Sequence, residues 1–160
     1  AKLQDQVPPF PSSEAVAVLE ATYRKPLHEV FQSFEETPVA SASVAQVHFA
    51  VLPDGREAAV KILRPGIAPV IAHDIALLNI CADLMERLWA DGRLLRSREG
   101  VGEFEKILHD ELDLMRESAN CSQLKRNFAN SELLLVPEVY WDFCTADVMV
   151  MQRMEGYFLP

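Results

Sequence analysis

The chain has 160 residues, of which 49% are hydrophobic and 24% are charged; this composition fits a globular domain with a hydrophobic core and excludes large-scale disorder. Its formal net charge of −9 and its lack of a basic stripe argue against nucleic acid as the main partner and against an anionic membrane surface. The three cysteines form no CxxC pair, so neither a zinc ribbon nor a disulfide framework is expected.

The first part of the chain predicts two helices. Pro8-Pro9-Phe10-Pro11 halts any earlier helix, because proline lacks an amide proton and disfavours helical backbone in the residue before it. Ser12 and Ser13 are candidate N-caps for a helix that runs to about Arg24. A short second helix is expected to begin at Pro26, a residue suited to a first helical turn.

A β-hairpin is predicted next. Residues 47–52 alternate between two sets of side chains with period two, which is typical of a strand. Pro53-Asp54-Gly55-Arg56 predicts a turn in which the glycine supplies a positive φ angle. Residues 57–63 are expected to form the returning strand.

Two long helices and two strands complete the expected order. Apolar residues recur at three- and four-residue steps through 69–90 and 102–128, as they do in amphipathic helices. Charged residues interrupt the apolar stretch 70–88, so we expect a soluble helix there and not a membrane span; no signal peptide is expected. The runs 133–136 and 148–151 are typical of strands.

Residues 40–47 fit the spacing of a kinase phosphate-binding loop. The run Ala40-Ser41-Ala42-Ser43-Val44-Ala45-Gln46-Val47 matches the template G-x-G-x-x-G-x-V, with alanine at all three glycine positions. Alanine resists positive φ, so we expect a loop stiffer than a glycine loop, in which the hydroxyls of Ser41 and Ser43 replace some lost phosphate contacts. The alternative is a strand entry rich in small residues.

Lys61 is the candidate phosphate-contacting residue. Ala59-Val60-Lys61 is close to the V-A-I-K signature of the third kinase strand. Residues two apart in a strand share a face, so Ala59 would leave room for a flat base on the face from which Lys61 reaches phosphate. Val60 and Ile62 would then supply core on the opposite face. The alternative is a surface lysine on an edge strand.

Three acids in the helix predicted at 102–128 are candidates to hold this lysine. Glu111 and Glu117 fall on apolar stripes of that helix, where a carboxylate is costly unless it is paired. Asp113 lies four residues before Glu117 and is expected to share its face. The alternative is that these acids are solvated.

The end of the last predicted strand is a candidate hinge. After Met151, at Gln152-Arg153-Met154, main-chain groups are expected to become free to bond the edge of a nucleotide base. A strand that simply ends in a glycine turn is equally compatible with the sequence.

Taken together, these stretches resemble the UbiB family of atypical kinase-like proteins, which is linked to ubiquinone biosynthesis. The likeness rests on residues 40–48, on Ala59-Val60-Lys61, and on Glu111-Leu112-Asp113 with Arg116-Glu117 and Asn120. It extends over nearly the whole chain, and the alanine loop is its distinctive element.

The resemblance implies an α+β fold, namely a protein-kinase-like N-lobe with a small antiparallel sheet and extra N-terminal and inserted helices. Residues 1–36 would form a helical preface, the truncated N-terminal extension of the family. Residues 37–160 would form an N-lobe that ends at the hinge, with the C-lobe absent. The chain contains no H-x-D catalytic loop and no Asp-Phe-Gly; Asp142-Phe143-Cys144 is a near miss that lies where a turn is expected.

Carried over residue by residue, the resemblance assigns no catalytic residue and no metal ligand to this chain. Lys61 would contact phosphate, and Glu117 would be its ion-pair partner. Glu111 and Asp113 would match a regulatory E-x-D element. The implied nucleotide-binding residues are Pro38, Val39, Ala40, Ser41, Ala42, Ser43, Val44, Ala45, Gln46, Val47, Ala59, Lys61, Met151, Gln152, Arg153 and Met154.

The function implied by the resemblance is the nucleotide-binding lobe of an atypical kinase-like ATPase required for ubiquinone (coenzyme Q) biosynthesis, inactive by itself. Its ligand would be ATP or ADP, with Mg²⁺ only when the C-lobe is present. Its partners would be that lobe, ubiquinone-pathway proteins and lipid precursors at the cytoplasmic side of the inner membrane, with self-association through apolar surface near Met151 and Met154. Two alternatives stay open: the N-lobe of a small-molecule phosphotransferase, or a non-catalytic domain that interacts with a lipid or a partner.

Overall fold

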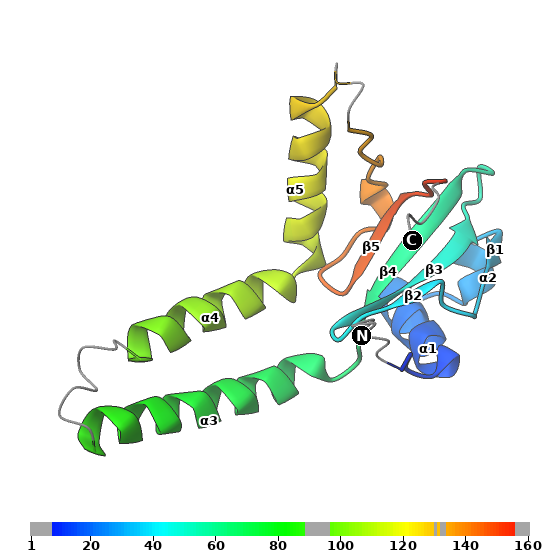
Figure 1. Cartoon of the computed structure of the whole chain (residues 1–160). Helices are drawn as coiled ribbons and strands as arrows, with labels where there is room; N and C mark the ends of the chain where they lie inside the picture. The colour runs from blue at the N-terminus through cyan, green and yellow to red at the C-terminus, as the bar shows by residue number, and fades with distance from the viewer. Residues whose placement is uncertain (1–7, 89–96, 130, 132–133, 156–160) are drawn as a thin grey trace, which may run out of the picture. The chain divides into compact units, whose positions relative to one another are not determined.

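The computed structural model describes residues 8–88, 97–129, 131 and 134–155 (Figure 1). The chain divides into two compact units. One consists of Ala1–Pro65 with Asp113–Pro160 and contains the sheet; the other, Gly66–Leu112, contains two helices. We refer to them as the sheet unit and the helical unit and describe each by itself.

The sheet unit is built on a small antiparallel sheet. Its strands are β1 (Ser33–Phe34), β2 (Ala40–Ser41), β3 (Ala45–Val51), β4 (Glu57–Leu63) and β5 (Val148–Gln152). The order is β1-β3-β4-β5, and β2 pairs with β3 as well. A small antiparallel sheet combined with helices is the α+β architecture that the sequence predicted.

The β3–β4 hairpin follows the prediction closely, because its turn is encoded locally. Gly55 takes a φ of +87°, and its N–H donates to the carbonyl of Leu52 at 2.9 Å. The N–H of Leu52 donates in turn to the carbonyl of Arg56, also at 2.9 Å. The predicted bounds of the returning strand, 57–63, are confirmed as β4.

The strand pairing separates the sheet into two faces, since residues directly opposite each other in antiparallel strands point the same way. Val60 pairs with Val150, so both side chains lie on one side, which we call the preface face. Lys61 pairs with Val47 and with Met149, and these lie on the other side, the lysine face. Every later statement about the site depends on this division.

Helices α1 (Ser12–Tyr23) and α2 (Leu27–Val30) cover the preface face (Figure 1). Val60 and Ile62 are fully buried there, which confirms the prediction that they supply core. The buried residues of this core are Phe10, Ala15, Leu19, Val30, Phe31, Ala50, Leu52, Ala58, Val60, Ile62, Tyr140, Val148 and Val150. The preface helices thus close one side of the sheet, and Lys61 lies on the other side.

The predicted N-caps of α1 are wrong. The helix begins at Ser12 itself, and Pro11 occupies the N-cap position without a side-chain hydrogen bond. The Ser12 hydroxyl donates instead to the carbonyl of Glu36 at 2.7 Å, so it ties the helix start to a later loop. The carbonyl of Pro11 accepts the N–H of Glu14 at 2.9 Å, so the first helical hydrogen bond forms without a serine side chain.

Helix α5 (Leu114–Asn127) packs on the lysine face, where a second, smaller core forms. Leu114 is fully buried among Ala45, Leu63, Val139 and Met149. The N–H of Leu114 donates to the carbonyl of Ala146 at 3.0 Å, which fixes the first turn of the helix to the loop before β5.

The strand predicted at 133–136 is wrong. Residues 134–136 form no strand, and residue 133 lies outside the described residues. The chain instead joins β5 slightly later, where Val139 bridges Met151 and the N–H of Tyr140 donates to the carbonyl of Val150 at 2.8 Å. Pro137 cannot donate a ladder hydrogen bond, so pairing begins only after it.

The helical unit consists of α3 (Ile67–Leu88) and α4 (Ser97–Glu111), which pack against each other (Figure 1). The helix predicted at 69–90 is confirmed as α3, apart from residues 89 and 90, which lie outside the described residues. Among the described helices, α3 alone contains a stretch, Ile67–Met85, that is long and apolar enough to cross a membrane by length and composition; 11% of that stretch is buried.

The single helix predicted at 102–128 is wrong, because the chain breaks it in two. Helix α4 ends at Glu111, and α5 begins at Leu114. Asp113 causes the break: its backbone is extended, and its carboxylate accepts a hydrogen bond from the N–H of Met115 at 3.0 Å as the N-cap of α5. A side chain that caps a new helix cannot continue the old one.

His48 is a buried polar residue on the preface face. Its Nδ1 lies 2.8 Å from the carbonyl oxygen of Glu35, and its Nε2 lies 2.9 Å from the side-chain nitrogen of Gln46. Both contacts are satisfied when the ring is neutral, donates from Nδ1 and accepts at Nε2. Burial lowers the pKa of His48 below its ordinary value, although the Glu35 carbonyl opposes this effect.

This arrangement predicts a loss of stability in acid. The unfolded chain takes up a proton on His48 as the pH falls through about 6.5, while the folded chain resists it, so the folded state loses up to about 1.4 kcal/mol per pH unit below that value. His48→Gln should reduce this slope in urea unfolding measured between pH 7.5 and 5.0, whereas His28→Gln, at an exposed histidine, should not. Equal slopes in the two variants would refute the assignment.

Candidate functional site

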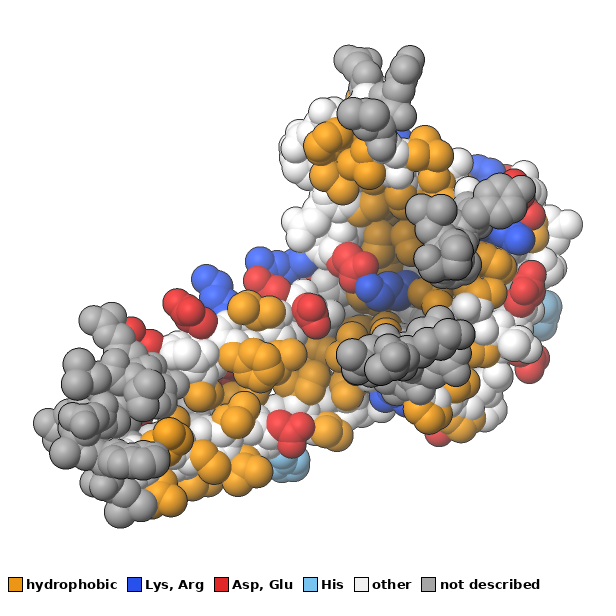
Figure 2. Space-filling model, in the orientation of Figure 1, with side chains coloured by type: hydrophobic (Ala, Val, Ile, Leu, Met, Phe, Trp, Pro, Cys, Tyr) orange, Lys and Arg blue, Asp and Glu red, His pale blue; other side chains and the backbone are white. Residues whose placement is uncertain are grey.

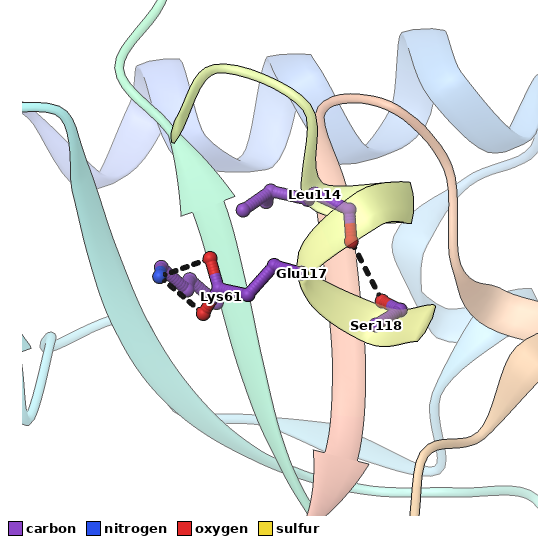
Figure 3. A network of polar contacts seen from close by, with 4 residues as sticks. All are labelled: Lys61, Leu114, Glu117 and Ser118. Atoms are coloured by element: carbon purple, nitrogen blue, oxygen red, sulfur yellow. Dashed lines mark hydrogen bonds and ion pairs between the residues drawn. The ribbon is translucent and has the colours of Figure 1, made fainter. Parts of the chain in front are cut away.

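An ion pair joins the middle of the sheet to helix α5. The Nζ atom of Lys61 lies 2.6 Å from Oε1 and 2.7 Å from Oε2 of Glu117, so the ammonium bonds both carboxylate oxygens (Figure 3). Lys61 reaches this position because the alternation of β4 turns it onto the lysine face, between Val47 and Met149.

The start of α5 sets the position of Glu117. Leu114 is anchored in the core, and Glu117 follows it by three residues, which places both on the side of the helix that faces the sheet (Figure 3). The buried hydroxyl of Ser118 donates to the carbonyl of Leu114 at 2.7 Å, so its hydrogen-bond partner lies within the same helix. Because the Asp113 cap sets where α5 begins, it also sets the position of the Glu117 carboxylate.

The ion pair is only partly shielded from solvent. The Lys61 side chain is 25% exposed and the Glu117 side chain 42% exposed. Solvent screens such a pair, so its contribution to folding is small and its two groups stay accessible to a ligand. A polyanion could therefore reach Lys61 without disrupting buried side-chain packing.

Small and apolar side chains lie beside Lys61 on the lysine face. Ala59 pairs with Phe49 on one side and with Met151 on the other, so these three form a row next to the row that contains Lys61. Ala59 is buried, and its methyl group is much smaller than the side chains of Phe49 and Met151 on either side of it. A flat ring is the kind of group that such a surface accommodates.

The alanine loop is a tight hairpin between β2 and β3. Ala40 pairs with Val47, and the N–H of Ala42 donates to the carbonyl of Ala45 at 2.8 Å, which leaves Ser43 and Val44 at the tip. Among the described residues, positive φ angles occur at Arg24, Gly55 and Gly66 and nowhere in this loop. The loop thus has a backbone that alanine adopts without strain.

The side chains of Ser41 and Gln46 lie on the preface face. Ser41 pairs with Gln46, which pairs with Ile62, so all three point away from Lys61. The Ser41 hydroxyl is buried without a hydrogen-bond partner among the described residues. The expectation that this hydroxyl replaces a phosphate contact is therefore wrong, and only main-chain groups of Ser41 and Gln46 could serve a ligand on the lysine face.

The three candidate acids have separate positions. Glu117 contacts Lys61 directly. Asp113 is the N-cap of α5: its carboxylate accepts from the N–H of Met115, and its carbonyl accepts from the N–H of Glu117 at 3.2 Å. Glu111 is the last residue of α4 and belongs to the helical unit. Its regulatory role stays a prediction.

The predicted hinge is less open than expected. The N–H of Gln152 donates to the carbonyl of Glu138 at 2.7 Å, and that of Arg153 donates to the carbonyl of Glu57 at 3.3 Å. These two amides are engaged, contrary to the expectation that they become free. The segment after Pro137 takes up the amide of Gln152, and the start of β4, at Glu57, takes up that of Arg153.

Arg153 and Phe49 form a contact that sequence reasoning missed. The guanidinium of Arg153 lies 4.0 Å from the centre of the Phe49 ring and 3.4 Å from a carboxylate oxygen of Glu57. The alternation of β3 from Val47 already indicated that Phe49 shares the lysine face. Nothing in the sequence indicated that Arg153 folds back over it.

Asp142-Phe143-Cys144 does not form part of the site. Residues Trp141–Phe143 form a short 3₁₀ helix, η2, in the turn before β5. The Cys144 thiol lies 3.4 Å from the backbone nitrogen of Val150, inside the sheet unit. Among the described residues, no group of three or more His, Cys, Asp or Glu side chains is placed to hold a metal ion.

Known proteins share both the sequence pattern and the fold. Residues 2–159 match the family model described as the ABC1 atypical kinase-like domain. A solved structure of Rv3197 from Mycobacterium tuberculosis, in complex with erythromycin, is 30% identical to this chain and superposes with a TM-score of 0.75. The similarity covers 93% of this chain and 37% of Rv3197, so the chain spans little more than a third of the length of that protein.

The geometry of the ion pair predicts that it contributes little to folding. Lys61→Met and Glu117→Gln, made singly and together, should give a coupling free energy of about 1 kcal/mol or less in urea unfolding, because the pair is partly exposed and screened. A coupling well above that range would mean that the pair is a structural element and would weaken its assignment to a ligand site.

Proposed function

Because this chain belongs to the ABC1 atypical kinase-like domain family, we propose that it is the ATP- or ADP-binding lobe of a kinase-like ATPase of that family. The observation that carries the proposal is the Lys61–Glu117 ion pair on the open face of the sheet. A carboxylate that holds a lysine in place is what kinase-like phosphate binding requires.

The residues of the lysine face fit a nucleotide. Ala59 and Val47 would lie against the base, and Lys61 would contact the phosphates beneath the turn at residues 42–45. Glu117 would hold the Lys61 ammonium in the orientation that contacts the phosphates. The bound nucleotide supplies the phosphoryl group; this chain's residues bind and orient it. Mg²⁺ would be held only with acidic side chains of a companion C-lobe.

Lys61→Ala should abolish ADP binding, because it removes the cation that meets the phosphates. Glu117→Gln should weaken binding by about tenfold, since it only positions the lysine. Isothermal titration of the full chain with ADP measures both effects.

Lys25→Ala is the control, since Lys25 is an exposed lysine between α1 and α2, the helices that cover the preface face. Its affinity should equal that of the unmodified protein. Undiminished ADP binding by a folded Lys61→Ala variant would remove the basis of the proposal.

For the whole protein we propose a role in ubiquinone biosynthesis at the cytoplasmic side of the inner membrane, with pathway proteins and lipid precursors as partners. The support is the resemblance of the alanine loop and the two downstream motifs to the UbiB proteins. The alternative is a small-molecule phosphotransferase; its support is that the similar protein Rv3197 was solved in complex with erythromycin. Loss of ubiquinone in cells that carry the Lys61→Ala variant would favour the first role.

A specific feature favours a second function, contact of the helical unit with a lipid surface. Figure 2 shows apolar side chains gathered along α3 and α4. The large apolar side chains exposed on these helices are Val70, Leu77, Leu78, Ile80, Leu84, Met85, Phe104 and Ile107. The stretch Ile67–Met85 carries two acids, Asp74 and Asp83, and no lysine or arginine, so the attraction would be apolar and not electrostatic.

The full chain should therefore float with neutral phosphatidylcholine vesicles as well as with anionic ones. Replacing both Leu77 and Ile80 with serine should lower the vesicle partition coefficient by about a hundredfold or more, since each burial is worth roughly 1.5–3 kcal/mol and about 1.4 kcal/mol is a factor of ten. Leu135→Ser, at an exposed leucine of the sheet unit, should change nothing. A requirement for anionic lipid, or no flotation at all, would argue for a protein partner or self-association instead.

A further inference from the structure

Arg64 joins the tip of the alanine loop to the N-terminal part of the sheet unit. Its Nε donates to the carbonyl of Ser43 at 3.1 Å, and one terminal nitrogen donates to the carbonyls of Ala42 at 3.4 Å and Pro8 at 3.1 Å. The guanidinium also lies 5.3 Å from the centre of the Phe10 ring. One side chain therefore holds two consecutive loop carbonyls and a segment more than thirty residues away.

Arg64 acts from the side of the sheet opposite Lys61. Leu63 packs with Leu114 on the lysine face, and the next residue points the other way. The contact of Arg64 with Phe10, which belongs to the core of the preface face, agrees with this alternation. The carbonyls of Ala42 and Ser43 are thus drawn toward the preface face.

This orientation of the carbonyls fixes the orientation of two amides. In a trans peptide the C=O of one residue and the N–H of the next point in opposite directions. With the carbonyls of Ala42 and Ser43 turned toward Arg64, the N–H groups of Ser43 and Val44 are turned toward the lysine face. Within the described part of the chain, neither of these two N–H groups donates a hydrogen bond.

Two successive unbonded amides that point the same way form a concave site for an anion. In a loop of glycines such amides can turn toward a phosphate when it arrives, but the alanines at 40, 42 and 45 restrict that movement. The orientation must then be set in advance by something outside the loop. Arg64 is the described side chain that bonds the loop carbonyls.

We propose that Arg64 is a positioning residue: from the preface face it holds the carbonyls of Ala42 and Ser43 and so presents the amides of Ser43 and Val44 to the phosphates of a nucleotide bound near Lys61. This inference rests on the proposed nucleotide-binding function and deepens it. It also gives Pro8 and Phe10 a role, because they share the guanidinium with the loop and restrain it from the N-terminal side.

The test separates the phosphate part of the ligand from the base. In the full chain, Arg64→Gln should weaken ADP binding about tenfold, as expected when hydrogen bonds to a charged group are misaligned. Binding of adenosine, which has no phosphate, should stay unchanged. Arg64→Lys keeps the charge but loses the planar guanidinium, so its affinity for ADP should lie between that of the unmodified protein and that of Arg64→Gln. Arg56→Gln, at an arginine that lies over Tyr140, is the matched control and should bind ADP normally.

A second measurement uses the unmodified protein and does not depend on how any variant folds. The backbone amide resonances of Ser43 and Val44 should shift when ADP is added and stay in place when adenosine is added.

The outcomes separate this inference from its premise. If the unmodified protein fails to bind ADP, the proposed function and the inference fall together. If it binds ADP and Arg64→Gln binds equally well, the function stands and the role of Arg64 is wrong. Equal weakening of ADP and adenosine would mean that Arg64 only stabilises the fold, and unshifted amides would exclude the anion site at the tip.

Discussion

The alternation of side chains along β4 is the constraint on which the rest of the sheet unit depends. Lys61 lies within β4, and Arg64 directly follows its last residue, Leu63; the contact of Arg64 with Phe10 places it on the face opposite Lys61. One cation meets Glu117 on α5, and the other meets the loop carbonyls above Phe10. A shift of register by one residue would exchange these faces, bury Lys61 in the preface core and leave Ile62 beside Glu117.

The two faces of the sheet have different roles. The preface helices bury one face against a core that includes Leu19 and Phe31, and this packing supplies most of the hydrophobic stabilisation. The lysine face carries a smaller core around Leu114 and leaves Lys61 partly accessible. Because rigidity comes from the first face, the second can retain polar groups that would be costly in a closed interior.

The sequence predicted those parts of the molecule that local chemistry decides. Gly55 and its neighbours are enough to specify the β3–β4 turn, and period two is enough to sort Val60 from Lys61. The break before α5 was missed because 102–128 has helical periodicity throughout, and only the cap made by Asp113 overrides it. The later start of pairing with β5 and the contacts of Arg64 join segments far apart in the chain, and no local pattern encodes them. The ligand roles proposed for the loop and for Lys61 came from family resemblance and not from spacing alone.

The anchoring of α5 has a consequence for how this helix can change. Leu114 and the Asp113 cap fix its first turn, and Glu117 lies within that turn, while Leu124 and Phe128 at the far end are exposed. Further along, Cys121 contacts the carbonyl of Pro137 and Lys125 pairs with Glu138, so the exposed end of the helix begins only after Lys125. A substitution at Phe128, 11 residues after Glu117, should therefore leave the carboxylate of Glu117 in place. Sequence changes after Lys125 could therefore create new contacts while the Lys61–Glu117 ion pair stays unchanged.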